Sequence, residues 1–282
     1  MLCKSLYEHE FSVQEWKPEL RDLPENATVF GLNAFTVDVL IQDNFMWEVS
    51  GVSAAKKVFI IHCEQNHNAE SSAFLRRVFS GEFDRVVIVS EHKRTTLRQY
   101  ANDPRILVIK HGSSFPARKT LPEIGRLGFV HNCLSSEKHH FMEKVSKGFN
   151  SVTIGFENDV WVGEKIEPID FEHYVEEFHK VDVFVNCVIG DSFGMTPMEA
   201  MASGIPSVLG MCKDCNDFPI HGVNCFQSGL RGHQSIRQIR EWIELLISNR
   251  ELNKRMGKTG RESVMHYFNP GVFRDLWKVA LA

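Results

Sequence analysis

The chain has 282 residues, of which 43% are hydrophobic, so it can bury the core of one large domain or two modest ones. It contains no run near the roughly 18 apolar residues that a membrane-spanning helix needs, and its first residues lack the apolar run of a signal peptide. The net charge of −4 is small, and the odd number of cysteines, 7, is typical of a reducing compartment. We therefore expect a cytoplasmic globular protein without a transmembrane segment.

The first half of the chain shows an α/β pattern. Residues 1–26 are mixed in character and predict no particular element. From Thr28 onwards, short β-rich runs alternate with helical patterns, which predicts a parallel sheet with crossover helices. The predicted strands are 28–35, 37–42, 56–63, 84–90 and 105–112, and the predicted helices are 69–79 and 91–101.

A second α/β set follows a segment at 113–125 that carries two prolines and few apolar residues. We place the linker there and predict two Rossmann-like domains, at 1–117 and 118–282. The predicted strands of the second domain are 126–132, 151–156, 160–169, 181–188 and 205–210. Its predicted helices are 137–149, 170–180, one from Pro197, and a helical tail from Ser235 that is broken at 269–271.

The segment DSFGMTPMEAMASGIPSV, which begins at Asp191, joins a predicted strand to a helix. Thr196 suits the N-cap, Pro197 the first helical position, and Glu199 the third position of a capping box, which alone would explain these residues. A glycine-containing loop that enters a helix N-terminus also favours a phosphate. Asp191 and Glu199 could then bracket a ligand with phosphate in its middle and hydroxyls at both ends, such as a nucleotide-diphosphate sugar.

The same segment resembles the E-x7-E region of the GT-B glycosyltransferases known as group 1, with its pattern FG-L-x-P-x-E-A-M-A-x-G-x-P-V. RILVIKHGSSF and RLGFVHNCLSSEKHH are more loosely similar to two upstream family segments, and IHGVNCF to a downstream one. The resemblance covers roughly residues 105–280 well and 55–100 in outline. It implies a GT-B fold, α/β, with two Rossmann-like domains facing across a cleft, here with a shortened N-terminal domain.

Carried over to this sequence, the resemblance implies a set of contacts to the donor sugar nucleotide, most simply a UDP-sugar. Glu199 would bind the ribose, Asp191 the sugar hydroxyls, and Lys138 the diphosphate, whose charge grows as the glycosidic bond breaks. Asn132 stands where the family has an arginine, so one phosphate contact brings no charge. The remaining expected contacts to the donor come from Ser192, Phe193, Gly194, Met195, Thr196 and Gly155.

The resemblance also bears on the chemistry. His62 matches a family histidine that faces the reacting centre, and Glu64 and His67 are nearby alternatives for a catalytic role. The group generally retains the anomeric configuration, with the leaving phosphate assisting deprotonation of the acceptor hydroxyl. We see no DxD-type motif and expect no metal and no prosthetic group.

The acceptor is less constrained. The stretch from Arg76 to Arg126 holds 11 Lys and Arg against 5 Asp and Glu, which indicates either a solvated basic face or a polyanionic partner. Small phage enzymes that glycosylate hydroxymethylated DNA share this fold, so our first expectation is a 5-hydroxymethylated pyrimidine in double-stranded DNA. The alternatives are an envelope saccharide or lipid acceptor, and a GT-B-like protein that binds DNA or saccharide without catalysis.

One further cluster competes for attention. Cys212, Cys215, His221 and Cys225 approach the spacing of a zinc knuckle, with the histidine displaced by one residue. They also fall where the family has a loop and a turn, so we expect free thiols rather than zinc.

Overall fold

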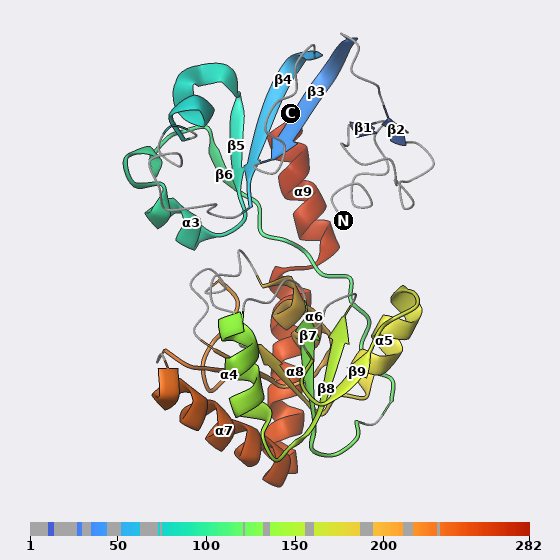
Figure 1. Cartoon of the computed structure of the whole chain (residues 1–282). Coiled ribbons are helices and arrows are strands. Elements are labelled where there is room, and N and C mark those ends of the chain that lie inside the picture. The colour runs from blue at the N-terminus through green and yellow to red at the C-terminus, as the bar shows by residue number, and fades with distance from the viewer. Residues whose placement is uncertain are drawn as a thin grey trace. The chain divides into compact units, whose positions relative to one another are not determined.

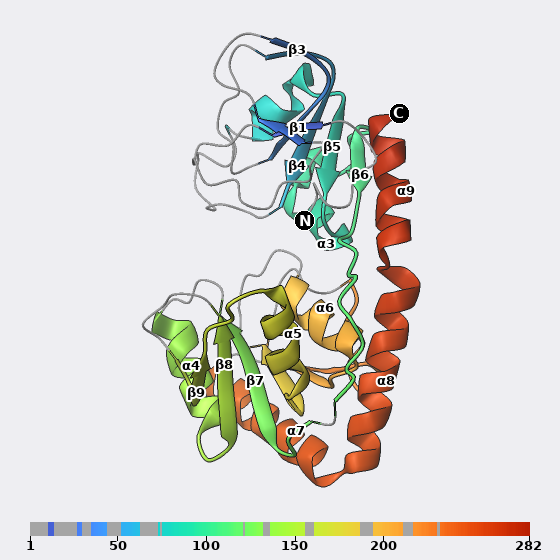
Figure 2. The ribbon, with the colours of Figure 1, turned by 90° about the vertical axis from the view of Figure 1, so that its right-hand side faces the viewer.

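The computed structural model describes residues 11–13, 27–29, 35–43, 52–62, 73, 75–120, 122–131, 136–155, 161–186, 194–210, 217–229 and 232–282. The chain divides into two units (Figures 1 and 2). Unit 1 contains Met1–Lys110 and Pro270–Ala282, and unit 2 contains His111–Asn269.

Unit 1 is built on a four-stranded parallel sheet in the order β3-β4-β5-β6. The strands are β3 (Phe35–Asp43), β4 (Val52–Ile61), β5 (Arg85–Ile88) and β6 (Ile106–Val108), and β1 (Phe11–Val13) pairs with β2 (Ala27–Val29) in a separate small parallel sheet. The helical segments are a π-helical turn at Val78–Glu82, α3 (Glu91–Thr96) and a 3₁₀ turn at Arg98–Tyr100. The predicted helix 91–101 is thus interrupted, because Arg98 adopts a left-handed backbone with φ 52°.

The core of unit 1 lies where hydrophobic runs of β4, β5 and β6 meet the turn before β5. A strand in a parallel sheet is covered on both faces, so its side chains can be apolar without alternation, and Val58–Ile61 and Val86–Val89 are all buried. One cluster joins Phe59, Ile61, Val86, Ile88 and Ile106 to Val78, Phe79, Phe83 and Leu97.

The last helix of the chain, α9 (Pro270–Leu281), belongs to unit 1 and contacts β4. Lys56 Nζ donates a hydrogen bond to the carbonyl oxygen of Leu281 at 3.2 Å, and Trp277 is buried. The division into 1–117 and 118–282 that we expect from sequence therefore differs from the observed units at both ends of unit 2.

Unit 2 has a six-stranded parallel sheet in the order β12-β11-β10-β7-β8-β9. The strands are β7 (Arg126–His131), β8 (Asn150–Gly155), β9 (Glu164–Ile166), β10 (Val183–Asn186), β11 (Ser207–Leu209) and β12 (Phe226–Gln227). The helices are α4 (Ser136–Ser146), α5 (Phe171–His179), α6 (Met195–Ser203), α7 (Gly232–Ser248) and α8 (Arg250–Tyr267). The predicted break at 269–271 is confirmed, since α8 ends at Tyr267 and α9 begins at Pro270.

Helices cover both faces of this sheet (Figure 2). Alternate residues of β7 and β10, among them Leu127 and Val183, join α4 and α7 in one buried cluster. Phe184, between them in register, stacks against Phe178 of α5, with ring centroids 5.6 Å apart. Residues 111–120 lead into the sheet without forming a helix or strand, which agrees with the predicted linker composition.

Candidate functional site

The strand order of unit 2 defines where a ligand can bind. Read from β9, the sheet runs back along the chain to β7 and then resumes with β10, so the order reverses between β7 and β10. In open parallel sheets the connections from two such strands leave in opposite directions, and a crevice opens at their carboxyl ends. The helices that follow these two strands are α4 and α6.

The start of α6 has the geometry of an anion site. Gly194 is the N-cap residue and adopts a left-handed backbone (φ 83°, ψ 55°), which favours glycine. The first intrahelical bond runs from the N–H of Met198 to the carbonyl of Gly194 at 3.1 Å. The N–H groups of Met195 and Thr196 therefore have no acceptor within the helix, and Pro197 has no N–H, so the helix presents its donors toward its N-terminal end.

This geometry corrects the predicted capping box. α6 begins at Met195 rather than at Pro197, so Thr196 lies inside the first turn and its side chain caps nothing. Glu199 is consequently in the second turn, too far along the helix to bond back to the N-cap residue. The capping role that competed with ligand binding for Glu199 is wrong, because a left-handed glycine begins the helix instead.

Glu199 is the one charged residue of α6, a helix whose neighbouring residues Met198, Ala200, Met201 and Ala202 are all fully buried. Its Oε2 accepts a hydrogen bond from the hydroxyl of Tyr174 in α5 at 3.3 Å. Burial raises the pKa of Glu199 to about 7, and the Tyr174 hydrogen bond opposes that rise. A desolvated carboxyl group at a sheet crevice is typical of a functional site.

The structure describes part of the predicted donor site. Gly155 ends β8 and pairs in register with His131, the last residue of β7, so it lies at the carboxyl edge beside the reversal of strand order. Lys138 is in the first turn of α4, but its side chain is outside the described part of the chain. Asn132, Asp191, Ser192 and Phe193 also lie outside the described residues, as do Glu64 and His67.

His62 belongs to unit 1, where it directly follows β4 at the carboxyl end of that sheet and is partly buried. Its position after a parallel strand agrees with the sequence prediction, while its catalytic role stays a prediction.

The residues of the predicted zinc cluster that the structure describes are engaged in other ways. Nδ1 of His221 accepts a hydrogen bond from the N–H of Gln227 at 3.1 Å, and the ring packs against Trp242, with centroids 5.0 Å apart. Cys225 is fully buried, and burial raises the pKa of its thiol to about 12. Cys212 and Cys215 are outside the described residues, so whether they bind metal stays untested.

We expect Cys225 to be inert toward thiol reagents in the folded protein, because its thiolate is scarce at pH 8 and its side chain is shielded. Titration with a chromogenic disulfide at pH 8 should give the same number of fast-reacting thiols in the parent and in Cys225→Ala. After unfolding, Cys225→Ala should show one thiol fewer. Fast loss of one reactive thiol on substitution would contradict the assignment.

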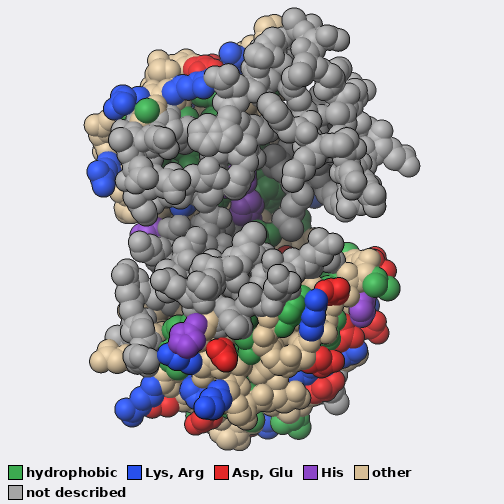
Figure 3. Space-filling view, in the orientation of Figure 1, with side chains coloured by type: hydrophobic (Ala, Val, Ile, Leu, Met, Phe, Trp, Pro, Cys, Tyr) green, Lys and Arg blue, Asp and Glu red, His purple; other side chains and the backbone are tan. Residues whose placement is uncertain are grey.

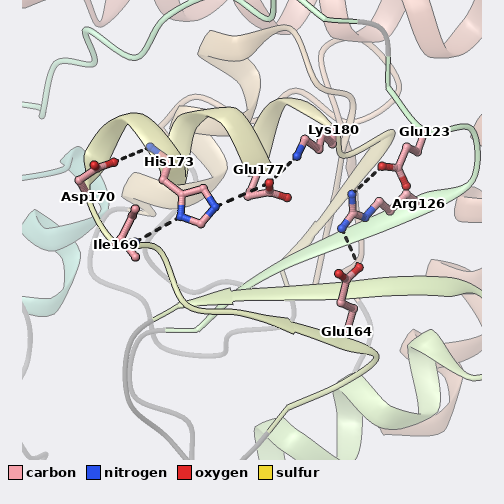
Figure 4. Close-up of polar contacts among 8 residues, drawn as sticks. All are labelled: Glu123, Arg126, Glu164, Ile169, Asp170, His173, Glu177 and Lys180. Atoms are coloured by element: carbon pink, nitrogen blue, oxygen red, sulfur yellow. Dashed lines mark hydrogen bonds and ion pairs between the residues drawn. The ribbon is translucent and has the colours of Figure 1, made fainter.

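A cavity of about 490 Å³ beside α5 and β9 is a second candidate site, lined by charged side chains (Figure 4). Arg126 is buried and donates to Glu123 at 2.9 Å and to Glu164 at 2.8 Å. Lys180 bonds Glu177, which also faces His173. These charges are paired with one another, so the geometry favours a structural network at the amino end of β7 rather than a ligand site.

The basic stretch at 76–126 is largely consumed by internal contacts. Lys93 is fully buried, Arg105 bonds Asp103 at 2.7 Å, and the Arg118 guanidinium donates to the carbonyls of Val181 and Gly204. Arg126 is held as described above. On the face of unit 2 in Figure 3, acidic and basic side chains lie interspersed. The described residues therefore offer far less free positive charge than the composition suggests.

Comparison with solved structures identifies the class of fold. TarM matches with a TM-score of 0.68 and 14% identity over 86% of this chain and 54% of TarM, a protein also solved from S. aureus. Sucrose-phosphate synthase from Thermosynechococcus elongatus gives 0.66 and 14% identity, covering 86% and 72% of the two chains. Anabaena HepE with UDP and glucose gives 0.61 and 15%, covering 80% and 71%. The chain has the GT-B fold, as predicted, and spans about half the length of TarM.

The family comparison is narrower. The model of the family described as "Glycosyl transferases group 1" matches residues 166–263, about a third of the chain, and this span includes α5, α6 and Glu199. The resemblance noted in the sequence is confirmed over that segment. The curated proteins contain no match. Among the described helices none is long and apolar enough to cross a bilayer.

Proposed function

We propose that this chain is a group 1 glycosyltransferase that moves a sugar from a UDP-sugar to an acceptor hydroxyl with retention of the anomeric configuration. One observation carries the proposal: α6 starts at a left-handed glycine beside the reversal of strand order and bears a desolvated carboxyl group in its second turn. A diphosphate suits the helix start, and a ribose diol suits the carboxylate of Glu199.

The distribution of donors supports a ligand that is anionic in its middle. The N–H groups of Met195 and Thr196 and the positive end of the α6 dipole favour phosphate oxygens. We propose that Lys138, which stands in the first turn of α4, adds the positive charge that the departing diphosphate needs. Asp191 would accept from sugar hydroxyls, Asn132, Ser192 and Phe193 would complete the contacts, and His62 would face the reacting centre.

The choice of nucleotide draws on related proteins. HepE was solved with UDP and glucose, and the pneumococcal O-GlcNAc transferase GtfA with UDP and GlcNAc. TarM was solved with Fondaparinux, alpha-GlcNAc-glycerol and UDP. These ligands favour UDP as the nucleotide of the donor here as well.

For the acceptor we propose a saccharide hydroxyl in preference to DNA. Contact with duplex DNA relies on several free Lys and Arg side chains that neutralise phosphates. In the described part of the chain, Arg105, Arg118 and Arg126 are committed to internal partners, and Lys93 is buried. Uncharged sugar hydroxyls make no comparable demand on surface charge.

The proposal is tested with purified protein and a panel of UDP-, GDP- and ADP-sugars. Without acceptor, slow release of free sugar and UDP from one donor is the expected result. Mass spectrometry of glycans and of hydroxymethylated DNA incubated with that donor then identifies the acceptor, and NMR of the product gives the anomeric configuration. No hydrolysis and no UDP binding by calorimetry would sink the proposal, whereas a mass gain on DNA alone would restore the DNA acceptor.

A further inference from the structure

Glu199 is supported by a side chain that lies 25 residues away and that sequence patterns do not connect to it. Tyr174, in α5, donates its hydroxyl to Oε2 of Glu199 at 3.3 Å. Burial raises the pKa of the Tyr174 phenol well above its ordinary value, with the neighbouring carboxylate adding to the rise. Tyr174 therefore stays protonated and remains a hydrogen-bond donor at every pH where the protein is folded.

The ring of Tyr174 is fixed by aromatic neighbours. It stacks on Phe178, one helical turn away, with centroids 5.5 Å apart and planes inclined by 17°. Phe115 meets it edge-on at 5.8 Å and 88°. Phe115 is buried and is anchored because the N–H of Ser113 donates to the carbonyl of Phe268 at 2.8 Å. These contacts leave the hydroxyl little freedom to turn away from Glu199.

We infer that Tyr174 is a positioning residue for the donor site: its hydroxyl orients the Glu199 carboxylate and keeps it in the ionised form that accepts from the ribose hydroxyls of a uridine nucleotide. The inference rests on the proposed function. It adds a residue from α5 to a site that is otherwise built from α4, α6 and the ends of β7, β8 and β10.

The chemistry behind this role is a balance at one carboxyl group. Burial favours the protonated acid, and a protonated Glu199 can accept fewer hydrogen bonds from a diol. A hydroxyl donor stabilises the ionised form and lowers the pKa of Glu199 toward neutrality. Because Tyr174 occupies Oε2, Oε1 is the oxygen left for a ligand, so the hydrogen bond also sets which way the carboxylate faces.

Other titratable or charged groups on the elements around Glu199 are directed elsewhere. His179 of α5 contacts the carbonyl oxygen of Pro116 at 3.3 Å, and burial lowers its pKa, so it is neutral above pH 7. Arg118 donates to Val181 and Gly204, and Arg261 of α8 to the carbonyl of Ala202. A pH effect on Glu199 is thus expected to follow Tyr174.

The test compares Tyr174→Phe, which keeps the stacked ring and removes only the hydroxyl, with Tyr267→Phe, which removes a hydroxyl from an exposed tyrosine of α8. UDP affinity is measured by calorimetry from pH 6 to pH 9. We expect Tyr174→Phe to bind UDP about tenfold more weakly at pH 7 and to recover most of that loss at pH 9, where Glu199 ionises without help. Tyr267→Phe should follow the parent at every pH.

A second measurement keeps the two proposals separable. The carboxyl carbon of Glu199, assigned through Glu199→Gln, is titrated by NMR without any ligand. Its midpoint should rise in Tyr174→Phe and stay in place in Tyr267→Phe. An unchanged midpoint, or an equal loss of affinity at pH 7 and pH 9, would overturn the role of Tyr174. A parent protein that shows the Tyr174-dependent midpoint but binds no UDP would instead overturn the proposed function.

Discussion

Glu199→Gln should weaken UDP binding by about 100-fold, measured by calorimetry at pH 8. The amide keeps the shape of the side chain but removes the charge, and hydrogen bonds to a charged acceptor contribute about 1.5–3 kcal/mol each. Two ribose hydroxyls would lose such an acceptor. Glutamine also presents an NH₂ group where Tyr174 or a ligand hydroxyl expects an oxygen.

The same substitution should stabilise the protein in the absence of ligand. The pKa of Glu199 is raised from 4.5 to about 7 on folding, so the folded state holds this proton more tightly than the unfolded state does. Stability is lost as pH rises from 4.5 through 7, and by pH 8 the buried carboxylate costs on the order of 2 kcal/mol. Urea unfolding should therefore show Glu199→Gln more stable than the parent at pH 8 and equal to it near pH 4.

The matched control is Glu251→Gln, which removes a carboxylate from the exposed start of α8. It should change neither UDP affinity nor the pH dependence of unfolding appreciably. If Glu199→Gln binds UDP as the parent does, Glu199 is not a donor contact. If it is destabilising at pH 8, the carboxylate makes favourable interactions that the described residues do not include.

Gly257→Ala is expected to destabilise unit 2 by about 3 kcal/mol. Gly257 lies in α8 where that helix crosses the end of α6, and an added Cβ would stand 2.3 Å from the carbonyl oxygen of Gly204. The obstruction is backbone rather than a flexible side chain, so one of the two helices must shift. Since the N-terminus of α6 forms the candidate site, UDP affinity should fall along with stability.

The control for Gly257→Ala is Gly229→Ala, because nothing lies within 4 Å of a Cβ added at Gly229. That substitution should be neutral or slightly stabilising, since it reduces the freedom of the unfolded chain. Chemical unfolding of both variants, followed by tryptophan fluorescence, provides the measurement. Equal stability of Gly257→Ala and the parent would mean that α6 and α8 do not pack as closely as described.

Much of the fold follows from sequence because its signals are local. Parallel strands buried on both faces, such as β5 and β10, appear as short apolar runs, and the break between α8 and α9 is written in a proline. The start of α6 was harder to predict. Thr196 and Pro197 satisfy every rule for an N-cap and first residue, yet the left-handed Gly194 begins the helix two residues earlier than Thr196 would have placed its cap.

The candidate site divides along the same line. Glu199 is recognisable from the segment around it, whereas its partner Tyr174 depends on α5 packing beside α6, which no local pattern encodes. The charge balance of residues 76–126 misled for a related reason. Composition counts every cation equally, but folding buries Lys93 and directs Arg118 to backbone carbonyls.

The assignment of α9 to unit 1 has a consequence for synthesis on the ribosome. Unit 2 is a continuous stretch of chain inserted into unit 1, so all of its strands and helices have been translated once residue 269 emerges. Unit 1 still lacks Trp277 and the bond from Lys56 to Leu281 at that moment. We therefore expect the half translated first to mature last, waiting for the final helix while the inserted half is already folded.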